Sequence, residues 1–397
     1  MHSILFLITS LLSLSPTEGN EIPHYWLPEI VVTAKRIKEP LADVAIDMKV
    51  ISEEEITRKG VRSLADLLNE EAFLDTRTTG IEGGLLTVGL RSFPSDQLLV
   101  LLNGIVLNSP ANGSFDFSEI PLSSIKRIEI VKSPSSSLYG ANASSGVINI
   151  ITEKLRDDTY YELNGDISDK GGKHISGEAG HGNEVFKTHL SISKRTGEGE
   201  RLNSNFNSLH GAASLFILKS ITAQFSAGER TVGVPGPIPS PAYIPVYGDS
   251  TVYSLFDNQK THHRSGTVQY RKMFAHFTIT SKLGYRKEDL WFSQMYQGFR
   301  EDWSVYKASD EWFYATEQLS GSFQCSFKDL SLGVDVINQE FWAYDSLFDK
   351  DRDSLVSTLA WNPIRKNKGF WSSGKLHFLN NRIIPSASIR WDKNNDY

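Results

Sequence analysis

The stretch that decides the fold is Leu98–Lys154, which reads LLVLLNGIVLNSP, then a polar segment, then IPLSSIKRIEIVKSPSSSLYGANASSGVINIITEK. It holds three short apolar runs that are rich in leucine or β-branched residues: Leu98–Leu102, Ile128–Val131 and Val147–Ile151. Gly, Pro, Asn or Ser bounds each run, a pattern that is typical of short strands joined by turns. The stretch therefore predicts the sheet of a small αβ domain.

The residues before this stretch predict two short helices. Ser52, with Glu55 three positions later, has the pattern of a capping box at a helix start, and Thr57–Gly60 has the pattern of its end. Ser63 is expected to begin a second helix with an apolar face. Strands are expected at Val44–Val50 and at Leu86–Arg91.

Four segments in this part of the chain resemble the plug domain of TonB-dependent outer-membrane receptors. They are VGLRSF, LLNGIVLN, IPLSSIKRIEIVKSP and LYGANASSGVINI, and they follow one another in the order and spacing of that family. Asn103 replaces the commoner Asp and Ser133 replaces the commoner Gly, and neither change disturbs the turn because Asn tolerates turn geometry almost as well as Asp. The resemblance implies an α+β plug domain at 41–155 that fills a transmembrane barrel. The residues expected to shape this plug are Arg91, Asn103, Gly104, Glu129, Pro134, Tyr139, Gly140, Gly146 and Asn149.

One charge pair is expected inside the plug. Glu129 lies between Ile128 and Ile130, and a half-buried carboxylate needs a partner. Arg91 is the candidate partner, and the alternative is that Arg91 is solvated.

The segment 1–19 is interpreted as a signal peptide. Ile4–Leu14 is an apolar run of the length of a signal-peptide core and too short for a membrane helix. Neither Lys nor Arg precedes the run, so a disordered or buried segment is the alternative. Export would place the protein in the outer membrane of a Gram-negative-type cell.

The segment 20–40 is interpreted as a linker that carries an energy-coupling motif. Ile30–Thr33 is a short strand former beside the basic residues Lys35, Arg36 and Lys38, and a free segment of this kind suits pairing with another protein's sheet. By resemblance, the motif is a TonB box made of Glu29, Ile30, Val31, Val32, Thr33 and Ala34. Its partner would be a TonB-type energy-coupling protein of the inner membrane. The alternative is an ordinary first strand of the plug.

The segment 156–397 has the pattern of a transmembrane β-barrel. Apolar residues alternate with polar ones over about ten positions, as in FKTHLSIS at Phe186–Ser193, and about twelve such segments follow one another. Short breaks at Asn183, Lys219, Phe274 and Lys328–Asp329 alternate with long breaks at Thr196–Phe206, Thr231–His262 and Asp289–Glu311. A plug of this size needs a barrel of the roughly 22-stranded class, so the barrel is interpreted as incomplete, either a truncated product or a partial sequence.

Composition excludes several other classes of protein. A net charge of −6 does not fit a nucleic-acid-binding footprint, and no run of about 18 apolar residues could form a spanning helix. The single Cys325 excludes an internal disulfide and a Cys-based zinc site. His262 and His263 would point to opposite faces of a strand and are interpreted as polar loop-end residues, so neither a metal nor a cofactor is expected. The common catalytic motifs do not occur in a convincing context, so the chain is not expected to be an enzyme.

The resemblance implies a receptor that imports a scarce ligand by energy-coupled remodelling of the plug. The alternative is a receptor fragment that binds ligand or signals without transport. A proline-rich loop at Thr231–His262 is similar to a loop of vitamin B12 receptors in this family, so cobalamin is the first expected ligand and a ferric siderophore or similar iron chelate the second. Ligand is expected on plug loops that carry no apolar run, at Thr79, Gly80, Ser92, Phe93, Ser95, Asn108, Asn112 and Ser114.

Overall fold

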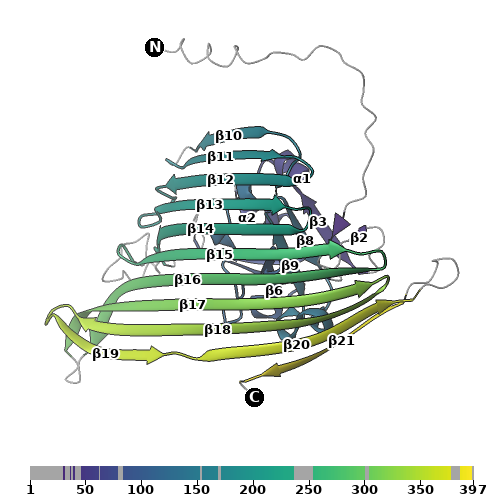
Figure 1. Cartoon of the computed structure of the whole chain (residues 1–397). Coiled ribbons are helices and arrows are strands. Elements are labelled where there is room, and N and C mark those ends of the chain that lie inside the picture. Colours follow the sequence, from purple (N-terminus) through teal and green to yellow (C-terminus); the bar gives the residue numbers. More distant parts are fainter. Residues whose placement is uncertain are drawn as a thin grey trace, which may run out of the picture.

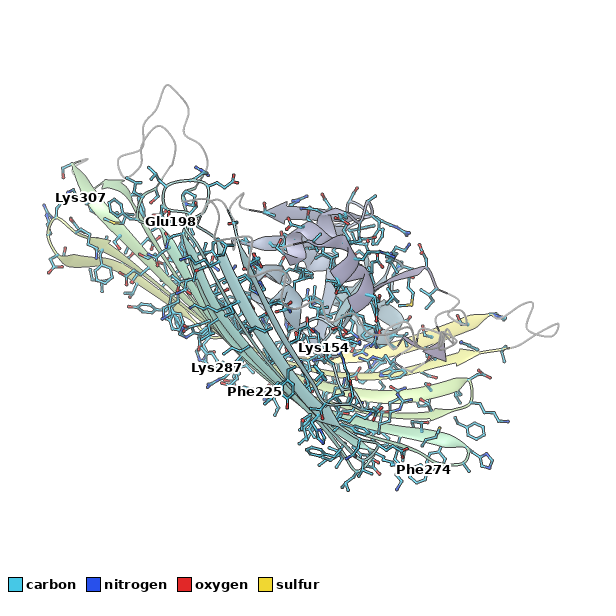
Figure 2. The ribbon with its side chains drawn as sticks, turned by 90° about the horizontal axis from the view of Figure 1, so that it is seen from above. Lys154, Glu198, Phe225, Phe274, Lys287 and Lys307 are labelled. Carbon is cyan, nitrogen blue, oxygen red and sulfur yellow. The ribbon has the colours of Figure 1, made fainter. Side chains whose placement is uncertain are left out.

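The computed structural model describes residues 30–31, 36, 39–40, 46–61, 63–78, 84–152, 154–168, 171–236, 254–299, 304–376 and 385–395. In these ranges the chain forms an N-terminal αβ domain and one large antiparallel sheet. The sheet curves around the N-terminal domain, which lies on its concave side (Figure 1, Figure 2).

The N-terminal domain is built on a five-stranded sheet. Its strand order is β3 (Met48–Ser52), β8 (Arg127–Val131), β9 (Gly146–Ile151), β6 (Leu98–Leu102) and β7 (Ile105–Val106). Strands β6 and β9 are parallel, and the other neighbours are antiparallel. The three apolar runs of the sequence thus form the three central strands, as predicted.

Two further strand pairs belong to this part of the chain. The strands β4 (Leu74–Thr78) and β5 (Leu86–Leu90) form a separate antiparallel pair. Near the start of the described residues, β1 (Ile30–Val31) pairs with β2 (Glu39–Pro40).

Both predicted helices form, but only half of the capping box predicted at Ser52 is recorded among the described residues. In α1 (Glu53–Lys59), the Ser52 side chain accepts a hydrogen bond from the Glu55 amide. In α2 (Leu64–Asn69), Ser63 and Asp66 form a complete capping box. The other helical turns are α3 (Ser136–Tyr139) and the 3₁₀ turns η2 (Ser95–Gln97), η3 (Phe117–Glu119), η4 (Leu122–Ser124) and η5 (Ala141–Ala143).

The core of the N-terminal domain lies between the five-stranded sheet, the two helices and the β4–β5 pair. Its most buried side chains include Leu67, Leu68, Leu90, Ile128 and Ile148. Gly146 lies where a Cβ atom would overlap the Leu90 side chain and the Val131 carbonyl, so only glycine allows β9 to approach both. The close packing holds the connections on either side of these strands in fixed positions.

The large sheet contains twelve strands within the described residues, in agreement with the predicted number. They are β10 (Tyr160–Ile167), β11 (Lys173–Gly182), β12 (Phe186–Gly197), β13 (Phe206–Ile217), β14 (Ile221–Gly233), β15 (Asn258–Met273), β16 (Phe277–Phe299), β17 (Val305–Phe327), β18 (Leu330–Asp349), β19 (Ser354–Trp361), β20 (Ile364–Lys375) and β21 (Ser386–Asn394). Each strand is antiparallel to its neighbours, and β19 and β20 both pair with β18, one after the other along its length.

The connections distinguish the two ends of the sheet. The predicted short breaks occur at 183–185, 218–220, 274–276 and 328–329, and we call this the inner end. The longer connection at 198–205 lies at the outer end, where β14 ends and β15 begins, and the connection between β20 and β21, at 376–385, is the exception at the inner end. Short turns on one side and longer loops on the other are the usual arrangement of an outer-membrane barrel.

Two of the predicted long breaks differ from the structure. Asp289–Glu311 is not a loop, because backbone pairing of β16 with β17 continues as far as Phe299 opposite Val305. The sequence was misleading here because charged residues interrupt the alternation while the backbone ladder continues. The break at Thr231–His262 is shorter than predicted, since β14 extends to Gly233 and β15 begins at Asn258.

The large sheet turns its apolar side chains outward. Leu190, Leu283 and Leu319 are 60%, 63% and 60% exposed on the face away from the N-terminal domain. The alternating polar residues His189 and Gln318 are 1% and 2% exposed on the other face. In Figure 2, Phe225 and Lys287 lie on the convex face, whereas Lys154 lies between the N-terminal domain and the sheet. This polarity is the reverse of a soluble protein's and suits a wall that contacts lipid outside and a polar filling inside.

The helices of the described residues are short. None of them is both long enough and apolar enough to cross a bilayer.

Candidate functional site

Asn103 and Gly104 form the tight turn between β6 and β7. Both have positive φ, 51° and 81°, which is the backbone geometry of a two-residue hairpin turn. The Asn103 side chain accepts from the Thr152 amide (2.9 Å), and the Asn149 side chain accepts from the Gly104 amide (3.1 Å). These two asparagines therefore fix the turn against β9.

The predicted Arg91–Glu129 pair is wrong. Arg91 follows the end of β5 in a left-handed conformation and reaches Asp47 (2.6 Å) and the Lys132 carbonyl (2.8 Å) on the surface. Glu129 is fully buried and pairs with Arg127 (2.7 Å) on its own strand. Residues two positions apart on a strand share a face, so the nearer arginine is the one that Glu129 meets.

The loop that contains Pro134, Tyr139 and Gly140 contacts the large sheet. Pro134 is exposed just before α3, and Gly140 ends α3 with a φ of 91° beside Arg390 of β21. Burial raises the pKa of the Tyr139 hydroxyl well above its ordinary value. The loop thus forms a contact with the inner half of the sheet.

Arg36 links the N-terminal segment to this same contact. Its guanidinium binds both carboxylate oxygens of Asp335 in β18 at 2.9 and 2.7 Å. It also lies over the rings of Tyr139 (4.6 Å) and Trp371 (5.0 Å). Asp335 in turn accepts from Arg390 (2.7 Å), which donates to the Leu138 carbonyl (2.9 Å). The N-terminal segment, the N-terminal domain and three strands of the sheet therefore meet at one carboxylate.

Only part of the predicted TonB box falls within the described residues. Ile30 and Val31 form β1 and pair with Glu39 and Pro40, although the sequence suggested no nearby partner. Glu29 and Val32–Ala34 lie outside the described residues, as does the predicted signal peptide.

A cavity of about 550 Å³ lies between the N-terminal domain and the outer half of the large sheet. The N-terminal domain contributes α2, Gly84 and the segment Phe117–Leu122. The sheet contributes polar and charged side chains that include Arg195, His210, Arg230 and His263. Its volume lies in the range that small-molecule sites usually have. We call it the outer cavity.

Two arginines of the sheet bind the plug segment 107–119, part of which lines the outer cavity. Arg230 binds Asp116 (2.5 Å) and the Ser118 hydroxyl. Arg286 donates to the Leu107 carbonyl (2.6 Å) and lies 3.6 Å from Glu119. The segment is thus fixed by groups that belong to different parts of the chain.

Among the described acids of the N-terminal domain, the pKa of Glu119 is raised far above its ordinary value. Burial first, and then the nearby charge of Glu288, raise the pKa of its carboxyl well above the ordinary value. Arg286 opposes this shift. A carboxyl in this position can hold a proton at a pH where an exposed glutamate is ionised.

The structure brings together two of the predicted ligand loops. The hydroxyls of Ser95 and Ser114 are 2.8 Å apart, and Asn112 accepts from the Ser114 amide (3.0 Å). Ser92 and Phe93 form an exposed turn next to them in sequence, with Phe93 50% exposed.

Asn108 and the predicted loop residues Thr79 and Gly80 do not belong to this pair of loops. Asn108 is buried, and its amide bonds Val100, Leu98 and Gly113 of the backbone, so it supports the loop from within. Thr79 and Gly80 lie outside the described residues, between Thr78 and Gly84, which both line the outer cavity.

The two adjacent histidines lie inside β15 and not at a loop end, because the strand begins before them at Asn258. They face opposite sides, as predicted. His263 lies 5.4 Å from His210 between ring centroids and lines the outer cavity, and His262 is 3.8 Å from Glu229. Among the described residues, no group of three or more His, Cys, Asp or Glu side chains could hold a metal ion.

Sequence reasoning missed the sheet residues that meet the N-terminal domain. Arg230, Arg286, Asp335 and Arg390 are charged residues on the polar face of alternating strands. Their position in the pattern showed that they face inward. Their partners depend on pairings across more than a hundred residues, for which the sequence holds no local signal.

Comparison with known proteins agrees with this architecture. Residues 40–147 match the family model of the TonB-dependent receptor plug domain. A vitamin B12 transporter BtuB of Vibrio vulnificus is 41% identical over 123 residues, which are 31% of this chain and 20% of the relative. Another, from Photobacterium profundum, is 35% identical over 171 residues, 40% of this chain and 27% of the relative.

A solved structure extends the likeness beyond the plug. BauA, the ferric preacinetobactin receptor from Acinetobacter baumannii, superposes with a TM-score of 0.68 at 12% identity and covers 93% of this chain. The match spans 61% of that receptor, and those to the two curated relatives span 20% and 27% of their lengths. The likeness at this identity concerns the fold, and it includes both the N-terminal domain and the large sheet.

The curated relatives and the solved structure are transporters and receptors, not enzymes. The plug motif, the polar-inside sheet that surrounds it and these matches support a TonB-dependent receptor, with a plug domain followed by part of a β-barrel.

Proposed function

We propose that the protein imports a scarce ligand across the outer membrane, and that it does so by energy-coupled movement of the plug. The single observation that carries this proposal is the Arg36–Asp335 contact. It joins the segment directly after the proposed TonB box to the barrel and, through Tyr139, to the plug. A pull on this segment would act on the plug–barrel contact directly.

The same contact suggests how a pull would be transmitted. Arg36 and Arg390 share the Asp335 carboxylate, and Arg390 also holds the Leu138 carbonyl of the plug. Removing Arg36 would break its contacts with Asp335 and with the Tyr139 ring, and so remove one of the links between the plug loop and the sheet. Charge-assisted hydrogen bonds are strong while water is excluded and weaken when their geometry is lost.

We propose cobalamin as the first candidate ligand and an iron chelate as the second. The identity of the plug region to vitamin B12 transporters supports cobalamin. The ligand would enter from the outer end and meet the outer cavity, with the paired loops at Ser95 and Ser114 and the exposed Phe93 as further contacts. In this proposal Thr79, Gly80, Ser92 and Asn112 belong to the same outward loops, and Asn108 supports them.

The division of the chain follows from this function. Residues 1–19 would direct export, 20–40 would present the TonB box to the energy-coupling protein, 41–155 would form the plug, and 156–397 would form barrel strands. Pairing of the box with another protein's sheet would compete with the short β1–β2 pair.

Uptake of labelled ligand tests the proposal. Cells that lack their own cobalamin receptor would express the complete receptor, with and without the TonB-type protein, and be offered labelled cobalamin or a labelled iron chelate. Surface binding in both strains, with uptake only where the energy-coupling protein is present, is expected for one of the two ligands. Binding without uptake in either strain would instead support a receptor that binds or signals without transport.

A further inference from the structure

A second cavity, of about 460 Å³, lies on the opposite side of the plug sheet from the outer cavity. It is bounded by the plug residues Asn103, Arg127 and Asn149 and by the inner halves of β13–β18 and β20. We call it the inner cavity. Like the outer cavity, it has the volume of a small-molecule site.

The charges that line the inner cavity are mostly positive. Arg36 and Arg127 have carboxylate partners in Asp335 and Glu129. Lys219 lies at the exposed rim and pairs with Glu184. Two further cations, Arg271 and Lys282, also line the cavity. A cavity with low-dielectric walls and an excess of one charge concentrates ions of the opposite charge.

Arg271 and Lys282 approach the cavity from neighbouring strands. Arg271 lies opposite Thr280, and Lys282 lies opposite Gln269, so the two cations are diagonal neighbours on the inward face. Lys282 Nζ donates to the Asn103 carbonyl (2.6 Å), which is a neutral group. In the part of the chain that the structure describes, Arg271 forms no ion pair within 4.0 Å.

Gln224 also lines the inner cavity and carries a further donor. The buried Nε2 of Gln224 has no hydrogen-bond acceptor within the described residues, whereas its Oε1 accepts from the Thr267 hydroxyl (3.1 Å). Buried donors without an acceptor are rare because they lose their bonds to water. The guanidinium of Arg271, the ammonium of Lys282 and the amide of Gln224 are donors at one cavity, and an oxyanion supplies several acceptors to such a set.

We propose that the inner cavity binds an oxyanion group, phosphate or carboxylate, between Arg271, Lys282 and Gln224. The bound group is either a free inorganic anion or the anionic part of an organic molecule. Because Lys282 also holds the Asn103 turn, an anion here contacts the barrel and steadies a plug contact at the same time. The site does not depend on which ligand enters from the outer end.

Equilibrium dialysis of the full chain in detergent micelles tests the site with two probes, labelled inorganic phosphate and labelled phenyl phosphate. Arg271→Gln is expected to raise the dissociation constant about tenfold, the effect of losing about one charge-assisted hydrogen bond. Lys272→Gln is the matched control, since Lys272 is the next residue, carries the same charge and is exposed on the outward side of β15. Gln224→Leu tests the third donor without changing charge.

Each outcome decides the proposal. Weaker binding by Arg271→Gln and Gln224→Leu with unchanged binding by Lys272→Gln supports it. Tighter binding of phenyl phosphate than of phosphate assigns an organic anion, and equal binding assigns a free ion. Equal weakening by Arg271→Gln and Lys272→Gln, or no binding of either probe to the unmodified chain, overturns it. Circular dichroism in the strand region confirms that the variants keep the fold.

Discussion

Arg36 and Asp335 are 299 residues apart in the sequence and share a two-oxygen ion pair at 2.9 and 2.7 Å. The carboxylate also binds Arg390, whose side chain is almost fully buried, so one acid holds two guanidinium groups of different segments. Both hydrogen bonds of Arg36 come from one nitrogen, Nη1, and each is charge-assisted. It makes the N-terminal segment part of the plug–barrel contact.

Replacement of Asp335 should release the N-terminal segment. Asp335→Asn removes the charge that holds Arg36, so trypsin is expected to cut after Arg36 several-fold faster, because cleavage requires a segment that can leave the surface. Asp353→Asn, in the exposed connection at 350–353, is the control and should leave the rate unchanged. Equal cleavage of both variants would show that the ion pair does not hold the segment.

Proline in the proposed TonB box should separate binding from uptake. Val32→Pro removes a backbone N–H donor and fixes φ at about −65°. A strand formed with the energy-coupling protein therefore loses a hydrogen bond. Ligand binding by the complete receptor is expected to survive and uptake to fail. Val32→Ile keeps strand propensity and should transport normally. Unchanged uptake in Val32→Pro would place the box in another segment.

The two charge pairs of the plug should differ in their effect on stability. Arg127→Met leaves the fully buried Glu129 without this partner and is expected to lower the free energy of unfolding by about 3–5 kcal/mol. Arg91→Met breaks a pair whose two side chains are about half exposed and should cost at most about 1 kcal/mol. Urea unfolding of the full chain in detergent, followed by fluorescence, measures both, and similar losses would contradict the assignment of partners.

Glu119 should make plug stability depend on pH. Its pKa is raised in the folded protein above the ordinary value of 4.5, so the folded state binds more protons than the unfolded state above that pH. The stability that this proton contributes is complete below 4.5 and is lost as pH rises through the raised pKa. Glu119→Gln should reduce the pH dependence of the urea unfolding midpoint between pH 4.5 and the raised pKa of Glu119. Glu184→Gln, on an 86% exposed side chain, should retain the slope of the unmodified chain.

The loop at Ser109–Ser114 should matter for ligand binding and little for folding. Replacement by a Gly-Ser linker removes the Ser95–Ser114 and Asn112–Ser114 contacts but leaves Asn108 in place. Surface loops tolerate such changes, so the far-ultraviolet spectrum should be unchanged while the affinity for the ligand falls. Unchanged affinity would exclude this loop as a ligand contact and leave the residues of the outer cavity as the candidates.

The sequence by itself determined the elements and the polarity of this protein. Apolar runs bounded by turn residues predicted β6, β8 and β9, and capping residues at Ser52 and Ser63 predicted both helices. Alternation over about ten residues indicated barrel strands and which side chains face inward. These features are local, because strand and helix periods and caps depend on residues only a few positions apart.

Tertiary structure alone decided the partners. The ion pairs that form are Arg91–Asp47, Glu129–Arg127 and Arg36–Asp335. The length of the β16–β17 hairpin follows from backbone pairing and not from the alternation of apolar and polar residues. The two cavities also exist only where inward residues of distant strands meet the plug. A buried charge pairs with an opposite charge that lies close to it in the folded chain. The distance between the two charges depends on the register of the strands, which is established only when the chain folds.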